Sequence, residues 1–173
     1  MIAAMSRKLF DGEVWVHYGQ IYVESGGRHL DLQESFAGQR NGLLGAAERG
    51  GLFLITGLHT GEVGFTVELH EQAPPVDDTW EEIVEASYQP LGDVALVCWG
   101  GEGSWPLDLD GFEYRVRYHA VRMDEANDLD TRAVEDPLVD RYLLQFWPAP
   151  PAPDRIIKQS SEDAAYWHST VGS

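Results

Sequence analysis

The chain has 173 residues, a formal net charge of −17 and a single cysteine, Cys98. This length is enough for a continuous apolar core, so we expect one domain over residues 1–173. One cysteine cannot form an internal disulfide, and no apolar run approaches the roughly 20 residues of a membrane span, so a cytoplasmic protein is expected. The negative charge argues against direct contact with nucleic acid or membrane and favours a basic protein partner.

The first half of the chain predicts strands. Residues 14–23 are rich in β-branched and aromatic side chains and are expected to form one long strand. Residues 32–48 contain three glycines, each of which weakens a helix by about 1 kcal/mol, so we expect a loop with at most a short helix. Residues 52–60 and 63–70 flank Gly61 and together predict a hairpin.

The second half continues the strand pattern. Residues 80–88 fit either a capped helix or an alternating strand, and we favour the strand. Residues 94–99 are apolar on both faces, which predicts a central strand with Cys98 in the core. Residues 113–120 alternate, and a last strand covers residues 142–147. In the alternating strand we expect solvent-facing side chains at Glu113, Arg115, Arg117 and His119.

Short strands with Gly and Pro turns, and no regular strand–helix alternation, predict an all-β fold. The expected architecture is an antiparallel β-sandwich, jelly-roll-like, closed by an extended strap and terminal helix over residues 148–173. The proline-rich segment 148–153 must be extended. Ser160 or Ser161 could cap the short helix, whose apolar residues Ala164, Ala165, Trp167 and His168 would dock on the domain.

No catalytic residue or cofactor site is predicted. The chain has no nucleophile elbow, phosphate loop or closely spaced histidine pair, and Asp108–Gly111 fits a turn better than a calcium loop. The strongest candidates for a metal are His59 and His70, which would face each other across the expected hairpin with Glu68 and Glu71 close by. A metal-dependent enzyme using the two histidines is therefore one alternative function.

A second alternative is a carbohydrate-binding β-sandwich. Aromatic side chains can stack on sugar faces, although aromatic residues in strands more often lie in the core. The candidate platform consists of Trp99, Trp105 and Tyr114.

Acidic residues gather in two segments that could imitate a row of phosphates in front of a basic protein. The first cluster contains Asp77, Asp78, Glu81, Glu82 and Glu85. The second contains Asp124, Glu125, Asp128, Asp130, Glu135, Asp136 and Asp140. A solvated surface explains such clusters equally well. An aromatic anchor, Trp80 or Trp105, would complete an interface.

Four segments resemble the competence protein J family of small acidic bacterial proteins. They are His17–Val23, Phe65–Leu69, Leu96–Gly100 and Tyr114–Arg117, within residues 12–124. Members of this family include an inhibitor of a DNA-entry nuclease, so the resemblance implies an inhibitor that binds a nuclease. The segments Gln145–Pro148 and Ala164–His168 have no counterpart in the family, and no site residue is carried over.

The leading hypothesis is therefore an acidic protein-binding module that inhibits a basic nuclease. Its expected contacts are the two acidic clusters without Asp140. An exposed sheet face would also permit a homodimer, and the sequence leaves the oligomeric state open.

Overall fold

The computed structural model describes residues 5–27 and 29–171. Eleven strands and three short helices are found in this part of the chain. The strands are β1 (Ser6–His17), β2 (Gln20–Ser25), β3 (Leu44–Gly45), β4 (Leu52–Ile55), β5 (Thr60–His70), β6 (Glu82–Tyr88), β7 (Val94–Cys98), β8 (Ser104–Leu107), β9 (Tyr114–Val121), β10 (Arg141–Pro148) and β11 (Arg155–Lys158). The helices are α1 (Leu32–Ser35), α2 (Met123–Leu129) and α3 (Glu162–Ser169), with a 3₁₀ turn, η1, at Trp99–Gly101.

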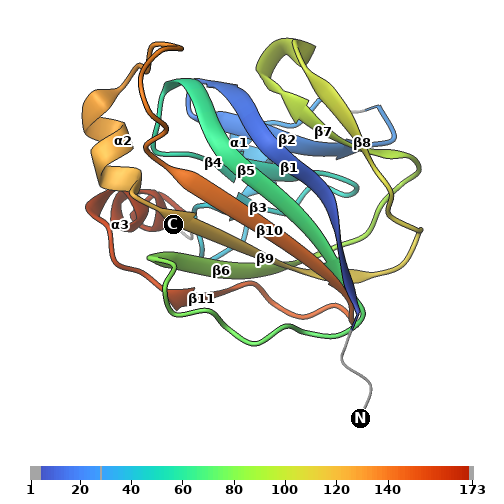
Figure 1. The fold of residues 1–173 in the computed structure, drawn as a ribbon. Helices are drawn as coiled ribbons and strands as arrows, with labels where there is room; N and C mark the ends of the chain where they lie inside the picture. Colours follow the sequence, from blue (N-terminus) through green and yellow to red (C-terminus); the bar gives the residue numbers. More distant parts are fainter. Residues whose placement is uncertain (1–4, 28, 172–173) are drawn as a thin grey trace.

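The strands belong to one connected, curled sheet in the order β11-β6-β9-β10-β5-β1-β2-β4-β3, with β7 and β8 branching from β2 (Figure 1). The strands from β11 to β1 in this order form one arm of the sheet, and β2, β4, β3, β7 and β8 form the other. The strands β1 and β2 pair through a single residue pair, His17 with Gln20. The predicted all-β fold is confirmed. The predicted jelly-roll order is not observed, because β5 and β10 run parallel to each other and all strands are connected.

A single apolar cluster fills the space between the two arms. The rings of Tyr118 and Tyr142 stack 5.7 Å apart at its centre. The Tyr118 hydroxyl donates to the Ile55 carbonyl at 2.9 Å, and the Tyr142 hydroxyl accepts from the Gly57 amide at 2.7 Å. Both hydroxyls are therefore paired inside the core. Cys98 is buried in β7, as expected, and burial raises the pKa of its thiol to about 11.

Two predictions for the N-terminal half are wrong. The expected strand over residues 14–23 is broken at Tyr18 and Gly19, which both have positive φ, 59° and 63°, and turn the chain from β1 into β2. The expected hairpin between residues 52–60 and 63–70 does not form, because β4 pairs with β2 and β3. β5 pairs instead with β1 and β10, so its register is set by partners distant in the sequence.

The outward face of β9 is not exposed. Arg115, Arg117 and His119 are 7%, 4% and 1% exposed, which contradicts their predicted placement in solvent. Strand alternation is correct here, but the strap covers part of this face and the loop before β6 contacts Arg117 through the Pro74 carbonyl. The favoured strand at residues 80–88 is observed as β6.

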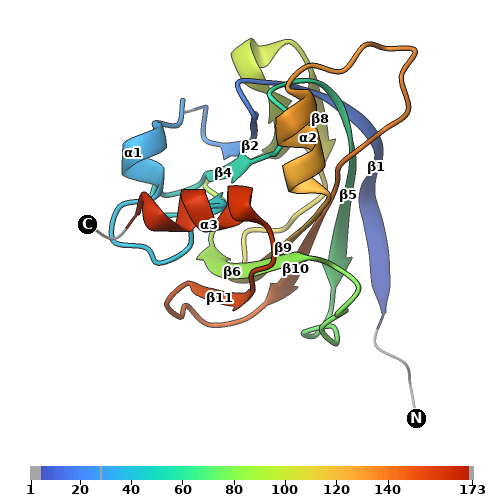
Figure 2. The same cartoon turned by 90° about the vertical axis from the view of Figure 1, so that its left-hand side faces the viewer.

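The C-terminal segment runs from β10 across this face, pairs with β6 as β11 and ends in α3 (Figure 2). Ser161 caps α3 by accepting the Ala164 amide at 3.1 Å, which confirms one of the two expected caps. Ala164 is fully buried and Trp167 packs against the core. None of the helices in the described residues has the length and apolar character needed to span a bilayer.

Candidate protein-binding surface

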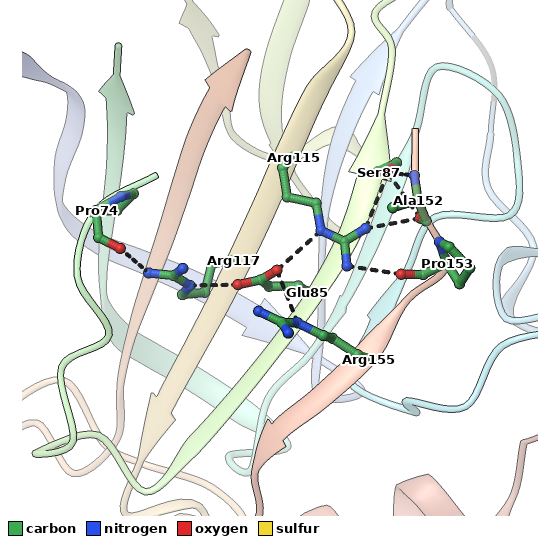
Figure 3. A network of polar contacts seen from close by, with 8 residues as sticks. All are labelled: Pro74, Glu85, Ser87, Arg115, Arg117, Ala152, Pro153 and Arg155. Carbon is green, nitrogen blue, oxygen red and sulfur yellow. Dashed lines mark hydrogen bonds and ion pairs between the residues drawn. The ribbon is translucent and has the colours of Figure 1, made fainter. Parts of the chain in front are cut away.

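Glu85, from the first acidic cluster, is buried and lies at the centre of an ion-pair network (Figure 3). Its carboxylate accepts from Nε of Arg115 at 3.1 Å, from Nε of Arg117 at 2.8 Å and from Nε of Arg155 at 3.3 Å. Burial by itself raises the pKa of Glu85, but the hydrogen bonds from Arg117 and Arg115 outweigh it, so the pKa is lowered. The side chain stays ionised and is committed to the fold.

The same arginines hold the covering segments in place. Arg115 donates to the carbonyls of Ala152 at 2.9 Å and Pro153 at 2.8 Å, and Arg117 donates to the Pro74 carbonyl at 2.7 Å (Figure 3). The Arg117 guanidinium also lies 4.9 Å from the centre of the Trp147 ring. The network therefore attaches the strap to the outer face of the sheet.

Glu82 is also buried, at 1% exposed. Its carboxylate accepts the backbone amides of Ser160 at 2.7 Å and Ser161 at 3.0 Å, where the strap leads into α3. The expectation that Glu82 and Glu85 contact a partner is therefore corrected: both face the strap and are enclosed by it. Only three members of the first cluster reach solvent, namely Asp77, Asp78 and Glu81.

The remaining part of the first cluster is locally ordered. Asp77 accepts the amide and hydroxyl of Thr79 at 3.0 and 2.6 Å, and these hydrogen bonds lower the pKa of its fully exposed carboxyl. Glu81 accepts the backbone amide of Arg122 and so contacts the start of α2. This patch is charged and exposed at the edge of the sheet.

The second cluster lies on α2 and on the loop that follows it, an arrangement that the sequence analysis missed. Glu125, Asp128, Asp130, Glu135 and Asp136 are exposed, whereas Asp124 is half-buried. Asp124 accepts the amides of Glu162 at 3.0 Å and Asp163 at 2.8 Å, and so joins α2 to the first turn of α3. Asp140, beyond the loop, is fully buried and pairs with the Tyr142 hydroxyl, so it is a core residue.

A groove of about 570 Å³ opens between α2, α3 and the turn that joins β1 to β2. We call it the acidic groove. Of the described residues that line it, none is lysine or arginine. Its side chains include the carboxylates of Asp124, Asp128, Asp130, Glu162 and Asp163, and the rings of Tyr18, His59, Tyr166 and Trp167.

The groove owes its shape to a close backbone approach. A Cβ atom on Gly57 would lie 2.4 Å from the Met123 carbonyl oxygen, so only glycine lets the loop after β4 approach the start of α2 this closely. The Gly57 amide donates to Tyr142 in the core. The groove is therefore built on elements that the core fixes.

Asp163 has an unfavourable charge at neutral pH. Burial and the nearby Asp124 carboxylate raise its pKa to about 6, while a hydrogen bond from the Trp167 side chain acts in the opposite direction. Its Oδ2 atom is buried and makes no hydrogen bond with the described residues. The wall of the groove on the α3 side therefore carries a carboxylate that tends to take up a proton.

The predicted aromatic anchors lie elsewhere. Trp80 packs against His119, 5.4 Å between ring centres, and Trp105 packs against Phe10 at 5.1 Å. The aromatic residues that do line the groove include Tyr18 and Tyr166, which are 52% and 59% exposed. Sequence reasoning missed Tyr18 because it lay inside a segment interpreted as strand; the glycine after it was the available signal for a turn.

The fold does not bring together the residues on which the two alternative functions, metal-dependent catalysis and carbohydrate binding, depend. His59 and His70 lie just before and at the end of β5, and the ten strand residues between them place them roughly 35 Å apart. The described residues contain no group of three or more side chains suited to hold a metal ion. Tyr114, from the proposed carbohydrate platform, is only 2% exposed, and Trp99 and Trp105 are half-buried in separate aromatic contacts.

No known protein-family profile matches the chain, and no curated protein matches it significantly. Two solved structures share its fold. One is ComJ from Bacillus subtilis, described as an inhibitor of the DNA-degrading activity of NucA, with a TM-score of 0.57 and 15% identity over 84% of this chain and all of ComJ. The other, described as crocagin biosynthetic gene J, has a TM-score of 0.55 and 10% identity over 84% of this chain and 99% of its own. The expected resemblance to the competence protein J family is therefore found in the fold.

Proposed function

We propose that this chain is a cytoplasmic inhibitor that binds a nuclease with a basic active-site face. The observation that carries the proposal is its fold likeness to ComJ, which is described as an inhibitor of a DNA-degrading nuclease. An enzyme that cleaves DNA must attract a polyanion, so its binding face is basic. A net charge of −17 makes the present chain electrostatically complementary to such a face.

The proposed contact surface is the end of the molecule that carries α2 and the loop after it. This region carries exposed apolar side chains as well as exposed acidic ones: Leu129 is 42% and Val134 is 70% exposed, and Tyr166 of α3, which lines the groove, is 59% exposed. Interfaces commonly combine a few apolar anchors with a polar rim. The contact residues that we propose are the members of the two clusters that are exposed or half-buried: Asp77, Asp78, Glu81, Asp124, Glu125, Asp128, Asp130, Glu135 and Asp136.

The test is an activity assay on captured protein. The immobilised chain is incubated with lysate of its native cell, washed at low salt and eluted at high salt, because charge-driven contacts weaken as salt rises. The eluate is assayed for DNA degradation. The proposal predicts that the eluate degrades DNA and that adding back free chain at a stoichiometric amount suppresses this activity.

The matched control is a chain with Asp128, Asp130, Glu135 and Asp136 changed to lysine, all of them exposed. It should capture much less nuclease. An eluate without DNA-degrading activity, or an activity that free chain does not suppress, would contradict the proposed function.

A further inference from the structure

Tyr18, at the rim of the acidic groove, occupies a backbone position that does not suit it. Its φ of 59° and that of Gly19, 63°, are both in the left-handed region, as in the tight turns between adjacent antiparallel strands that favour Asn followed by Gly. A non-glycine residue in this region costs on the order of 1–2 kcal/mol, and a bulky one is unusual there. The residue is nevertheless 52% exposed, so burial in the core does not account for the tyrosine.

The Tyr18 ring is held in a fixed position. Its centre lies 4.3 Å from the His17 ring, 5.1 Å from Trp99 and 5.2 Å from His59. The backbone around it is fixed as well, because the Gly19 amide donates to the His59 carbonyl at 2.9 Å and the Gly19 carbonyl accepts from Thr56 at 2.9 Å. The turn therefore presents a preorganised aromatic surface beside the groove.

The charges that line the groove indicate which chemical group would bind on this aromatic surface. Five carboxylates line it, and the described lining residues include no lysine or arginine. A flat cation that stacks on an aromatic ring and pairs with carboxylates through its edge satisfies both features, and guanidinium has this shape. An ammonium group would pair with the carboxylates but would use the ring less well.

We propose that the acidic groove receives an arginine side chain of the protein partner, which stacks on Tyr18 and pairs with Asp128 and Asp130. This inference rests on the proposed function, because it names what the basic partner inserts. It also explains the unsuitable residue in the turn: the exposed tyrosine lowers the stability of the free chain and contributes to binding.

The probes are hexa-arginine, hexa-lysine and hexa-citrulline peptides, titrated into the intact chain by calorimetry at low salt. Hexa-arginine should bind more tightly than hexa-lysine, and hexa-citrulline should not bind measurably. Tyr18→Asn should weaken hexa-arginine binding about fivefold, as expected from an exposed cation–π contact. Tyr18→Phe, which keeps the ring, should bind like the unaltered chain.

Thermal unfolding of the same variants distinguishes a binding role of the Tyr18 ring from a merely structural one, because the two roles predict opposite changes in melting temperature. Tyr18→Asn should raise the melting temperature because Asn suits the turn, whereas loss of a purely structural ring would lower it. Equal hexa-arginine affinity in the Asn and Phe variants would overturn the inference, and so would tighter binding of hexa-lysine.

A charge-matched pair locates the peptide. Asp128→Asn with Asp130→Asn removes two charges from the groove, whereas Asp110→Asn with Glu113→Gln removes two exposed charges outside its lining and outside the proposed contact surface. The first pair should weaken hexa-arginine binding several-fold more than the second, and equal losses would contradict a groove site. If Tyr18→Asn inhibits the nuclease as well as the unaltered chain does, the proposed function survives and this inference fails.

Discussion

The covered face of the sheet around Glu85 and the acidic groove both contain carboxylates from dense acidic segments, yet they use them in opposite ways. On the covered face one carboxylate is shared by three arginines and is 3% exposed. In the groove five carboxylates lie together without a lysine or arginine among the described lining residues. Acidic residues from segments of similar composition can therefore have unrelated roles, and the availability of countercharges within the fold decides between these roles.

The largest expected effect on stability comes from removing the charge of Glu85 on the covered face. Glu85→Gln should destabilise the chain by about 3–5 kcal/mol, because it leaves the buried Arg115 and Arg117 without their counterion. Urea unfolding measures the loss. The control is Glu125→Gln, which removes an ion pair to Arg122 that is about half exposed on both sides and should cost less than about 1 kcal/mol. Equal effects of the two changes would show that the covered face is not held by its buried charges.

His119, on the same face, should make the chain sensitive to mild acid. Burial lowers its pKa to about 4, against the opposing effect of a hydrogen bond to the Leu143 carbonyl. A histidine with a lowered folded-state pKa contributes stability above its ordinary value of about 6.5, and this stability is lost as the pH falls toward 4. The loss should reach about 3 kcal/mol at most, at about 1.4 kcal/mol per pKa unit.

Unfolding free energies measured at several pH values between 7 and 4 check this effect. His119→Gln, which cannot take up the proton, should show a clearly flatter profile than the unaltered chain. Parallel profiles would mean that His119 does not control the acid sensitivity.

On the groove side, Asp163 should make the stability of the chain change with pH in the opposite direction. The pKa of Asp163 is raised to about 6, so its charge destabilises the folded chain at pH 7.5 and the penalty disappears as the pH falls through 6 toward 4. Asp163→Asn should therefore stabilise the chain at pH 7.5 by about 1–2 kcal/mol, after allowance for partial solvent screening. The gain should vanish near pH 4, and Glu162→Gln, a neighbouring exposed change, should show no such dependence.

The sequence predicted individual strands better than the segments that pair with these strands or cover them. Residues 94–99, 113–120 and 142–147 formed strands as expected, because their β-branched and aromatic content and their alternation are local signals. The placement of Arg115 in solvent was wrong because alternation defines two faces but does not reveal that a strap from residues 148–158 covers one of them. The false hairpin had the same origin, since the partners of β5 come from distant segments.

The site was predicted only in part. Asp128 and Asp130, two exposed residues of the second cluster, were identified from composition alone, and both line the groove. Glu162 and Asp163 were assigned only to the first turn of a helix, because their position beside α2 depends on contacts between Asp124 and the start of α3. Tyr18 was hidden by a strand-like segment whose turn depends on two residues with positive φ.

The most direct test of the account is the inhibition of the captured nuclease by two charge-matched variants. Asp128→Asn with Asp130→Asn alters the groove, and Asp110→Asn with Glu113→Gln alters two exposed charges outside the groove and outside the proposed contact surface. The groove pair should raise the concentration needed for half-inhibition at least about tenfold, as expected for two interface charges worth roughly 1 kcal/mol or more each, while the outer pair should change it much less. Equal inhibition by both variants and the unaltered chain would contradict the claim that this end of the molecule binds the nuclease.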